Sequence, residues 1–206
     1  MCLRPSASIA IVGDVEAVPD RGALVGAMIS GMFGLAWTQW GAAGVSGSAS
    51  GAIRVAGIAI GLVIFFLSAR LRRSALRDSG SVSSAPPTEG AGSLFSSPAY
   101  RLVVALEVVA LLGGALLLGA IGHREYIIAW FATVVGIHFL ALARLFWVGF
   151  YGLGTALIAA GIAGAITGFA GGGLGGIQAV SGLIAAASLF VAGGWTVVRA
   201  RAGAHI

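Results

Sequence analysis

The chain has 206 residues, of which 58% are hydrophobic and 9% are charged, against about 25% charged residues in an ordinary soluble domain. This balance excludes a water-soluble globule and also a disordered chain, whose hydrophobicity is low and whose charge is high. The net charge of +5 comes from arginines that lie beside apolar segments, as topology determinants do, so nucleic acid is not an expected partner. The single cysteine, Cys2, excludes an internal disulfide and a cysteine-based metal site.

Six apolar runs are each about as long as the roughly 20 residues that cross a bilayer core. They cover residues 22–40, 51–69, 99–121, 126–147, 152–169 and 177–198. None of the five prolines lies inside a run, which removes the main objection to continuous helices. The sequence therefore predicts an all-α, polytopic membrane helix bundle of about six transmembrane helices, paired as three hairpins.

The polar segments between the runs predict the organisation of the chain. In order, we expect an N-terminal cytoplasmic segment (1–21), a first transmembrane hairpin (22–69), a flexible cytoplasmic loop (70–98), a central hairpin that carries polar residues (99–147), a third hairpin (148–198) and a basic cytoplasmic tail (199–206). Four arginines open the 70–98 loop, at positions 70, 72, 73 and 77. Under the positive-inside rule, this loop and both termini are cytoplasmic. The expected location is the cytoplasmic (inner) membrane of a bacterium, crossed several times.

Glycines recur at regular spacing in the first and third hairpins. Small residues recur every four positions at Gly22, Gly26, Ser30 and Gly34, at Gly57 and Gly61, and at Gly164 and Gly168. This spacing lets helix backbones approach closely in lipid, and it is compatible with a homo-oligomer. The run from Gly171 to Gly176 formally matches a dinucleotide-binding pattern, but no strand precedes it, so a flexible turn is the better prediction.

Glu107 is the acid that this composition does not explain. It lies within an otherwise apolar run, where a carboxylate costs about 2.5 to 3.5 kcal/mol on insertion scales. Such a residue usually faces a protein interior or a wet cavity. We therefore weigh a proton carrier or general acid against a carboxyl that simply ties two helices together.

His138 is expected at the same depth as Glu107. Glu107 follows Arg101 by six residues and His138 precedes Arg144 by six, so each is about 9 Å deeper than an arginine at the predicted cytoplasmic end. On adjacent antiparallel helices, the two could form a proton-sharing pair. The alternative for His138 is a structural hydrogen bond.

Further side chains near this depth are candidates for binding a substrate. They are Arg101 and Arg144, as anchors or as ligands for an anionic headgroup, Tyr100, which shares a helix face with Glu107, and Trp130, Phe131 and Phe139, whose ring faces would stabilise a cation. On the outer side, His123 and Glu125 stand two apart, which is not the spacing of helix-borne metal ligands. No metal site and no cofactor are expected.

The segment 107–146, with His123-Arg-Glu-Tyr-Ile, Val135-Gly-Ile-His-Phe and Leu142-Ala-Arg-Leu-Phe, together with Phe33-Gly-Leu-Ala-Trp, resembles a type of small bacterial multi-span membrane protein. The resemblance covers most of the chain and implies no activity and no catalytic residue. A looser likeness, in size and in lone intramembrane acids beside aromatic residues, is to the integral-membrane terpene cyclases. No motif carries that likeness, so it is an analogy only.

Three functions are weighed on these residues. The leading hypothesis is a membrane-embedded enzyme of cyclase or isomerase type, acting on a lipid-soluble substrate such as an isoprenoid without a redox cofactor. Glu107 would donate a proton, with His138 as its catalytic partner. The alternatives are a small proton-coupled transporter and a non-catalytic scaffold or assembly subunit held by small-residue helix faces. Membrane lipids are expected partners in each case.

Overall fold

A computed structural model describes residues 21–79, 97–145 and 148–202 of the chain. Its elements in order are α1 (Arg21–Ala43), α2 (Ser48–Ser79), α4 (Pro98–Ala120), the 3-10 turn η1 (Arg124–Tyr126), α5 (Ile127–Leu145), α6 (Gly149–Thr167), the π-helical turn η2 (Gly168–Gly172) and α7 (Gly173–Ala202). Over these described ranges the chain is helical and contains no strand. The predicted all-α class is thereby confirmed.

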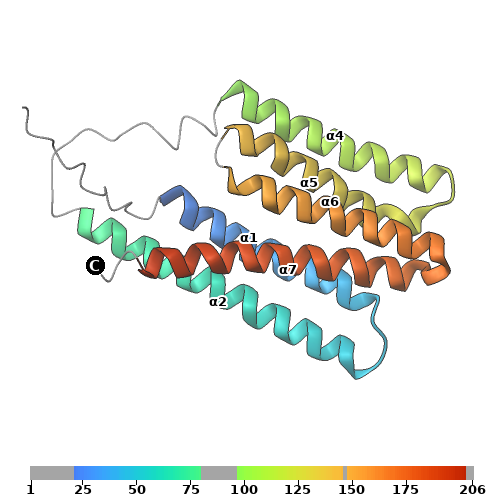
Figure 1. The fold of residues 1–206 in the computed structure, drawn as a ribbon, viewed down its shortest axis with the longest axis horizontal. Coiled ribbons are helices and arrows are strands. Elements are labelled where there is room, and N and C mark those ends of the chain that lie inside the picture. The colour runs from blue at the N-terminus through green and yellow to red at the C-terminus, as the bar shows by residue number, and fades with distance from the viewer. Residues whose placement is uncertain (1–20, 80–96, 146–147, 203–206) are drawn as a thin grey trace, which may run out of the picture.

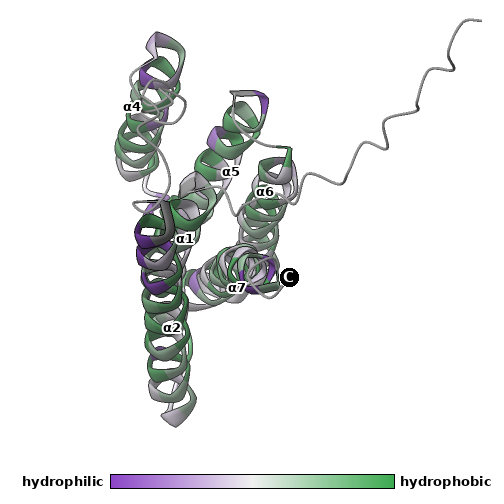
Figure 2. Ribbon diagram, turned by 90° about the vertical axis from the view of Figure 1, so that its left-hand side faces the viewer, coloured by the Kyte–Doolittle hydropathy of each residue, from purple (hydrophilic) through white to green (hydrophobic). Residues whose placement is uncertain are grey.

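Four helical stretches within the described residues are long and apolar enough to cross a membrane. They are Ser48–Arg77, Pro98–Ala120, Arg124–Arg144 and Gly149–Ala202, the last of which contains both α6 and α7. Apolar residues predominate along the helices, as the colouring of Figure 2 shows, so these four stretches suggest a membrane protein.

The long helices run side by side and alternate in direction along the chain (Figure 1). α1 lies between α2 and α7, α7 packs on α6, α6 packs on α5, and α5 carries α4 at the edge of the bundle. The starts of α1, α4 and α6 therefore lie at the same end of the bundle as the ends of α2, α5 and α7.

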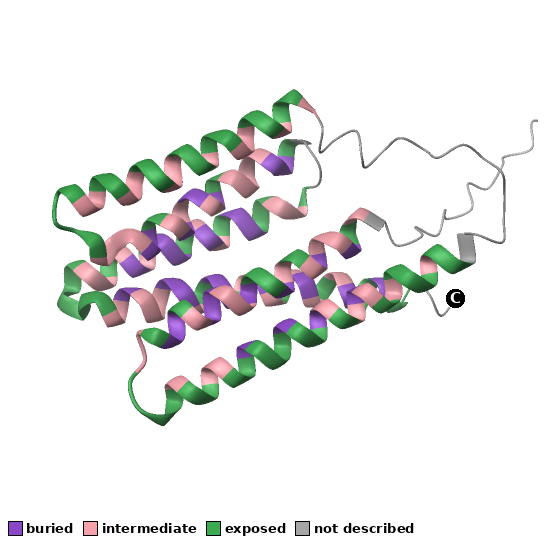
Figure 3. Ribbon diagram, turned by 180° about the vertical axis from the view of Figure 1, so that it is seen from behind, coloured by how far each residue is buried: buried purple, intermediate pink, exposed green. Residues whose placement is uncertain are grey.

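The main core lies where α1, α5, α6 and α7 meet, and it consists largely of small and branched side chains. Its buried members are Trp37, Ile128, Ala129, Ala132, Leu153, Leu157, Ala160, Ile177, Ala185, Ala186 and Leu189. A smaller cluster of Ala27, Ile64 and Val197 joins α1, α2 and α7. α4 contributes no buried residue to either cluster, and Figure 3 shows it as a band of exposed and intermediate residues.

Glycines let the central helices touch backbone to backbone. A Cβ on Gly182 of α7 would lie 2.5 Å from the amide nitrogen of Gly41 in α1, and one on Gly136 of α5 would lie 2.7 Å from the carbonyl oxygen of Gly154 in α6. The close approach predicted from the small-residue spacing is present at Gly61, where a Cβ would lie 2.8 Å from the Gly31 carbonyl oxygen. No such approach occurs at Gly26, where a Cβ would have no neighbouring atom within 4 Å.

The predicted start of the cytoplasmic loop at residue 70 needs correction. α2 continues through the arginine cluster to Ser79, because arginine, leucine and alanine are strong helix formers. Arg77 in the last turn also complements the helix dipole. The rest of the predicted loop, residues 80–96, lies outside the described residues.

The predicted flexible turn over the glycine run is shorter than expected. Gly171 and Gly173 have φ angles of 87° and 58°, a backbone region that glycine enters without steric cost. The chain reverses there, and α7 has already begun at Gly173. The later glycines of the run thus belong to a helix.

The backbone contact between α1 and α7 makes a prediction for Gly182. Gly182→Ala should lower the free energy of unfolding by about 1 to 3 kcal/mol, because the added methyl group would overlap the Gly41 backbone. Gly194→Ala on the same helix is the matched control, since it has nothing within 4 Å and should be neutral or stabilising by up to about 1 kcal/mol. Chemical unfolding of the purified protein in detergent measures both. Equal effects of the two substitutions would contradict the close approach.

Candidate functional site

Glu107 and His138 meet between α4 and α5. The Nδ1 atom of His138 lies 3.1 Å from Oε2 of Glu107, and the two side chains are 12% and 18% exposed, respectively. The Nδ1 atom has no partner that also satisfies hydrogen-bond angles, so the contact is defined by the short distance between the two atoms. The distance alone is short enough for a proton to be shared once the groups align.

Glu107 points toward α5 and not toward the outside of the bundle. Its own face of α4 is partly buried and also carries Val103, Ala110 and Gly114. The opposite face of α4 presents exposed apolar side chains, namely Leu102, Leu106, Val109, Leu112 and Leu116. This distribution places the carboxyl on the protein side of an edge helix, as expected for a costly intramembrane acid.

Trp130 holds α4 against α5 at a second level. Its indole Nε1 donates a hydrogen bond to the carbonyl oxygen of Ala110, at 3.0 Å. Gly114 leaves room for the ring, because a Cβ there would overlap the indole. Trp130 is therefore at least partly a packing residue, and its predicted role in binding a substrate stays a prediction.

The arginines predicted to bind a headgroup lie at one end of this hairpin. Arg101 is at the start of α4 and Arg144 is near the end of α5, and both are exposed. Tyr100, next to Arg101, is half-buried, and its backbone N–H donates to the Ser97 side chain that caps α4. The three residues therefore lie toward the end of the bundle where α4 begins and α5 ends (Figure 1).

The two predicted phenylalanines pack inward. Phe131 is half-buried against the main core. The Phe139 ring lies between the rings of His138 and Phe150, with centroids 5.8 and 5.5 Å away. Phe139 thus packs against the imidazole of His138 and links it to Phe150 of α6.

A pocket of about 410 Å³ lies at the other end of the same helices. It is lined by Leu118, His123, Tyr126, Ala129, Trp130, Thr133, Gly161, Ile162, Ala165 and Phe169. Trp130 is the only predicted substrate-binding residue in this lining, and neither Glu107 nor His138 belongs to it. The rings of Tyr126 and Phe169 stand 5.4 Å apart between centroids and form an aromatic wall.

The sequence alone does not distinguish Tyr126 or Phe169 as pocket residues. Both are aromatic residues at the ends of predicted spans, where rings also serve as interface anchors. Nearby, His123 Nδ1 lies 3.1 Å from Glu125 Oε1, with side chains 58% and 35% exposed. Among the described residues, no group of three or more histidine, cysteine or acidic side chains could hold a metal ion.

No protein-family model, curated protein or solved structure matches the chain. The resemblance to small bacterial multi-span membrane proteins and the analogy to terpene cyclases therefore stay predictions. Any function has to be argued from the Glu107–His138 contact and its surroundings.

The contact predicts energetic coupling between the two residues. Glu107→Ala and His138→Ala should each destabilise the protein, and the double variant should lose less than the sum, by a coupling of about 0.5 to 3 kcal/mol. The reason is that either single change leaves a polar partner in apolar surroundings. Unfolding of the four proteins in detergent measures the cycle.

The exposed His123–Glu125 pair provides the matched control, because it has the same chemistry and the same 3.1 Å separation. Its coupling should be smaller, since water screens exposed charges. Equal coupling in the two pairs would mean that the position of Glu107–His138 between α4 and α5 confers no special interaction.

Proposed function

We propose that the chain crosses the membrane six times, with both termini in the cytoplasm. The alternating helix directions in Figure 1 support this topology, because they bring the basic ends of several helices to one end of the bundle. The arginines on that end include Arg70, Arg72, Arg73, Arg77, Arg101, Arg144, Arg199 and Arg201. Arg54 and Arg124 lie toward the other end. An excess of arginine marks the cytoplasmic side.

Labelling of single cysteines tests this topology. In a Cys2→Ser background, Ser46→Cys in the connection between α1 and α2 should react in intact cells with a maleimide that does not cross membranes. Ser74→Cys on the arginine-rich part of α2 should react only after lysis. The reverse pattern, or labelling of both in intact cells, would contradict the proposed orientation.

We propose that the protein is a membrane-embedded enzyme in which Glu107 and His138 move a proton on a lipid-soluble substrate. The observation that carries this proposal is the 3.1 Å contact between His138 Nδ1 and Glu107 Oε2. In the proposed reaction, the Glu107 carboxyl gives its proton to an alkene carbon of the substrate. The resulting carbocation closes a ring or shifts its double bond, and a proton then leaves a neighbouring carbon for the carboxylate. No electron is gained or lost overall.

His138 would act as the proton partner of Glu107 in this cycle. Its imidazole can accept or return a proton at Nδ1 while Glu107 changes state. The edge-to-face contact of Phe139 with the imidazole keeps the ring in place. The two side chains therefore divide the work, with Glu107 as the donor and His138 as its partner.

The order of groups along α5 supports a long, apolar substrate such as an isoprenoid. Arg144 lies six residues from His138, about 9 Å, and Trp130 lies eight residues from it in the other direction, about 12 Å. If the anionic headgroup of the substrate binds at Arg101 and Arg144, its apolar tail would pass Glu107 and His138. The tail would then end in the pocket that Trp130 lines. Because α4 is an edge helix that packs mainly on α5, such a substrate would enter sideways from the bilayer.

The two alternatives find less support. A proton-coupled transporter would use the same pair, but it needs a polar path, whereas the pocket at the other end of α4 and α5 is lined mainly by apolar side chains. A scaffold would use its small-residue faces for partners, yet Gly41, Gly61 and Gly182 already serve contacts within the chain.

Loss of the Glu107 proton should abolish the reaction. In membranes incubated with a panel of prenylated substrates, Glu107→Gln should lower product formation by at least about 100-fold, since a positioned acid contributes about 10² to 10⁴ in rate. Glu125→Gln, the same change at an exposed carboxyl, is the control and should leave the rate unchanged. Product analysis by mass spectrometry reads both variants.

Equal turnover by wild type and Glu107→Gln would remove Glu107 from the mechanism. Substrate-driven proton flux in proteoliposomes, without any new product, would favour the transporter instead. A stable partner in a mild-detergent pull-down, with a neutral Glu107→Gln, would favour the scaffold.

A further inference from the structure

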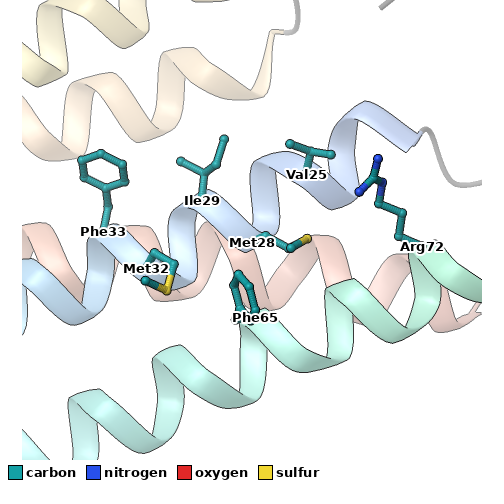
Figure 4. Close-up of a pocket in the computed structure, with 7 residues that line it drawn as sticks. All are labelled: Val25, Met28, Ile29, Met32, Phe33, Phe65 and Arg72. Atoms are coloured by element: carbon teal, nitrogen blue, oxygen red, sulfur yellow. The ribbon is translucent and has the colours of Figure 1, made fainter.

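A second pocket lies between α1 and α2, away from the Glu107–His138 pair, and we call it the α1–α2 slot. It has a volume of about 230 Å³ and is lined by Val25, Met28, Ile29, Met32, Phe33, Phe65 and Arg72 (Figure 4). Along α1 the lining runs from Val25 to Phe33, which are eight positions and therefore about 12 Å apart. The slot is thus elongated along the helices.

The walls of the slot suit a flexible hydrocarbon chain. Six of the seven lining residues are apolar, and the two methionines have unbranched, adaptable side chains. Ile29, Met32 and Phe33 are 49%, 48% and 56% exposed. Apolar surface is therefore open to the surroundings of the bundle along the slot, where a lipid chain can lie against it.

Arg72 gives the slot a charged end. It follows Phe65 by seven residues, which places it on the same face of α2 and about 10 Å further along. Figure 4 shows its guanidinium turned from α2 toward Val25, near the start of α1. The ion pairs found in the described residues are His123–Glu125 and His138–Glu107, so no acidic side chain in that part of the chain neutralises Arg72.

The neighbours of Arg72 reinforce its positive charge. Arg70, Arg73 and Arg77 lie on the same exposed part of α2. A guanidinium binds phosphate through its planar array of donors, and basic residues near a membrane surface attract anionic lipid. The charge of this end therefore complements an anionic phosphate group.

We propose that the α1–α2 slot binds one anionic glycerophospholipid. An acyl chain lies along the six apolar side chains, and the phosphate accepts hydrogen bonds from Arg72. The bound lipid bridges α1 and α2 at the arginine-rich end of the bundle. The site is separate from the proposed enzymatic function, and neither depends on the other.

Native mass spectrometry of the full-length protein in mild detergent tests the site, with phosphatidylglycerol and phosphatidylcholine added as separate probes. Wild type should retain one phosphatidylglycerol and bind it about tenfold more tightly than phosphatidylcholine. Arg72→Gln should weaken phosphatidylglycerol binding about fivefold to tenfold, because it removes the charge and donors that hold the phosphate. Arg72→Lys should retain more of the binding than Arg72→Gln.

Arg73→Gln is the matched control, since Arg73 is an exposed arginine on the same helix that does not line the slot. Its effect should be smaller than that of Arg72→Gln, since it removes a nearby charge but no group that holds the phosphate in the slot. Ile29→Trp fills the slot without changing any charge and should also weaken phosphatidylglycerol binding. Thermal unfolding and gel filtration check that every variant folds.

Three results would overturn the proposal. Equal losses in Arg72→Gln and Arg73→Gln would indicate a diffuse electrostatic surface. Unchanged binding in Ile29→Trp would show that the acyl chain does not use the slot. Complete displacement of phosphatidylglycerol by inorganic phosphate would indicate a free-phosphate site in place of a lipid site.

Discussion

The close approach of helix backbones is the constraint on which this bundle depends. In lipid there is little hydrophobic force between helices, so they associate through packing and polar contacts. Gly41 of α1 and Gly182 of α7 meet with no space for a side chain, and Gly136 and Gly154 do the same for α5 and α6. These contacts bring the core side chains of four helices together.

α4 is attached in a different way. It contributes no buried residue and reaches α5 through two polar contacts at different depths, Glu107 with His138 and the Ala110 carbonyl with Trp130. Glu107, the acid within an apolar span, therefore lies on the long helix that packs least against the others. Such a helix can shift with a smaller loss of buried contacts than any central helix, as the proposed entry of a lipid-soluble substrate would require.

The sequence predicts the helical class and the similar depth of Glu107 and His138 because both follow from strong signals, but it does not predict that the two side chains meet. Long apolar runs require helices in lipid, and equal spacing from Arg101 and Arg144 sets an equal depth. It could not predict which faces pack, since every face of α4 except the one with Glu107 is similarly apolar. It also could not predict the extension of α2 to Ser79, because a charged cluster ends an apolar span without ending the helix. The roles of Trp130 and Tyr126 depend on contacts between helices, which span-end aromatic residues do not reveal by themselves.

The central claim is that Glu107 and His138 act as one unit within the bundle. It is tested most directly by solid-state NMR of the protein in lipid bilayers, with the histidine rings labelled with nitrogen-15. Glu107→Gln should shift the Nδ1 resonance of His138 and leave that of His123 unchanged, because of these two histidines His138 is the one that faces Glu107. A His138 resonance that is identical in the two proteins would contradict the pair and the function proposed from it.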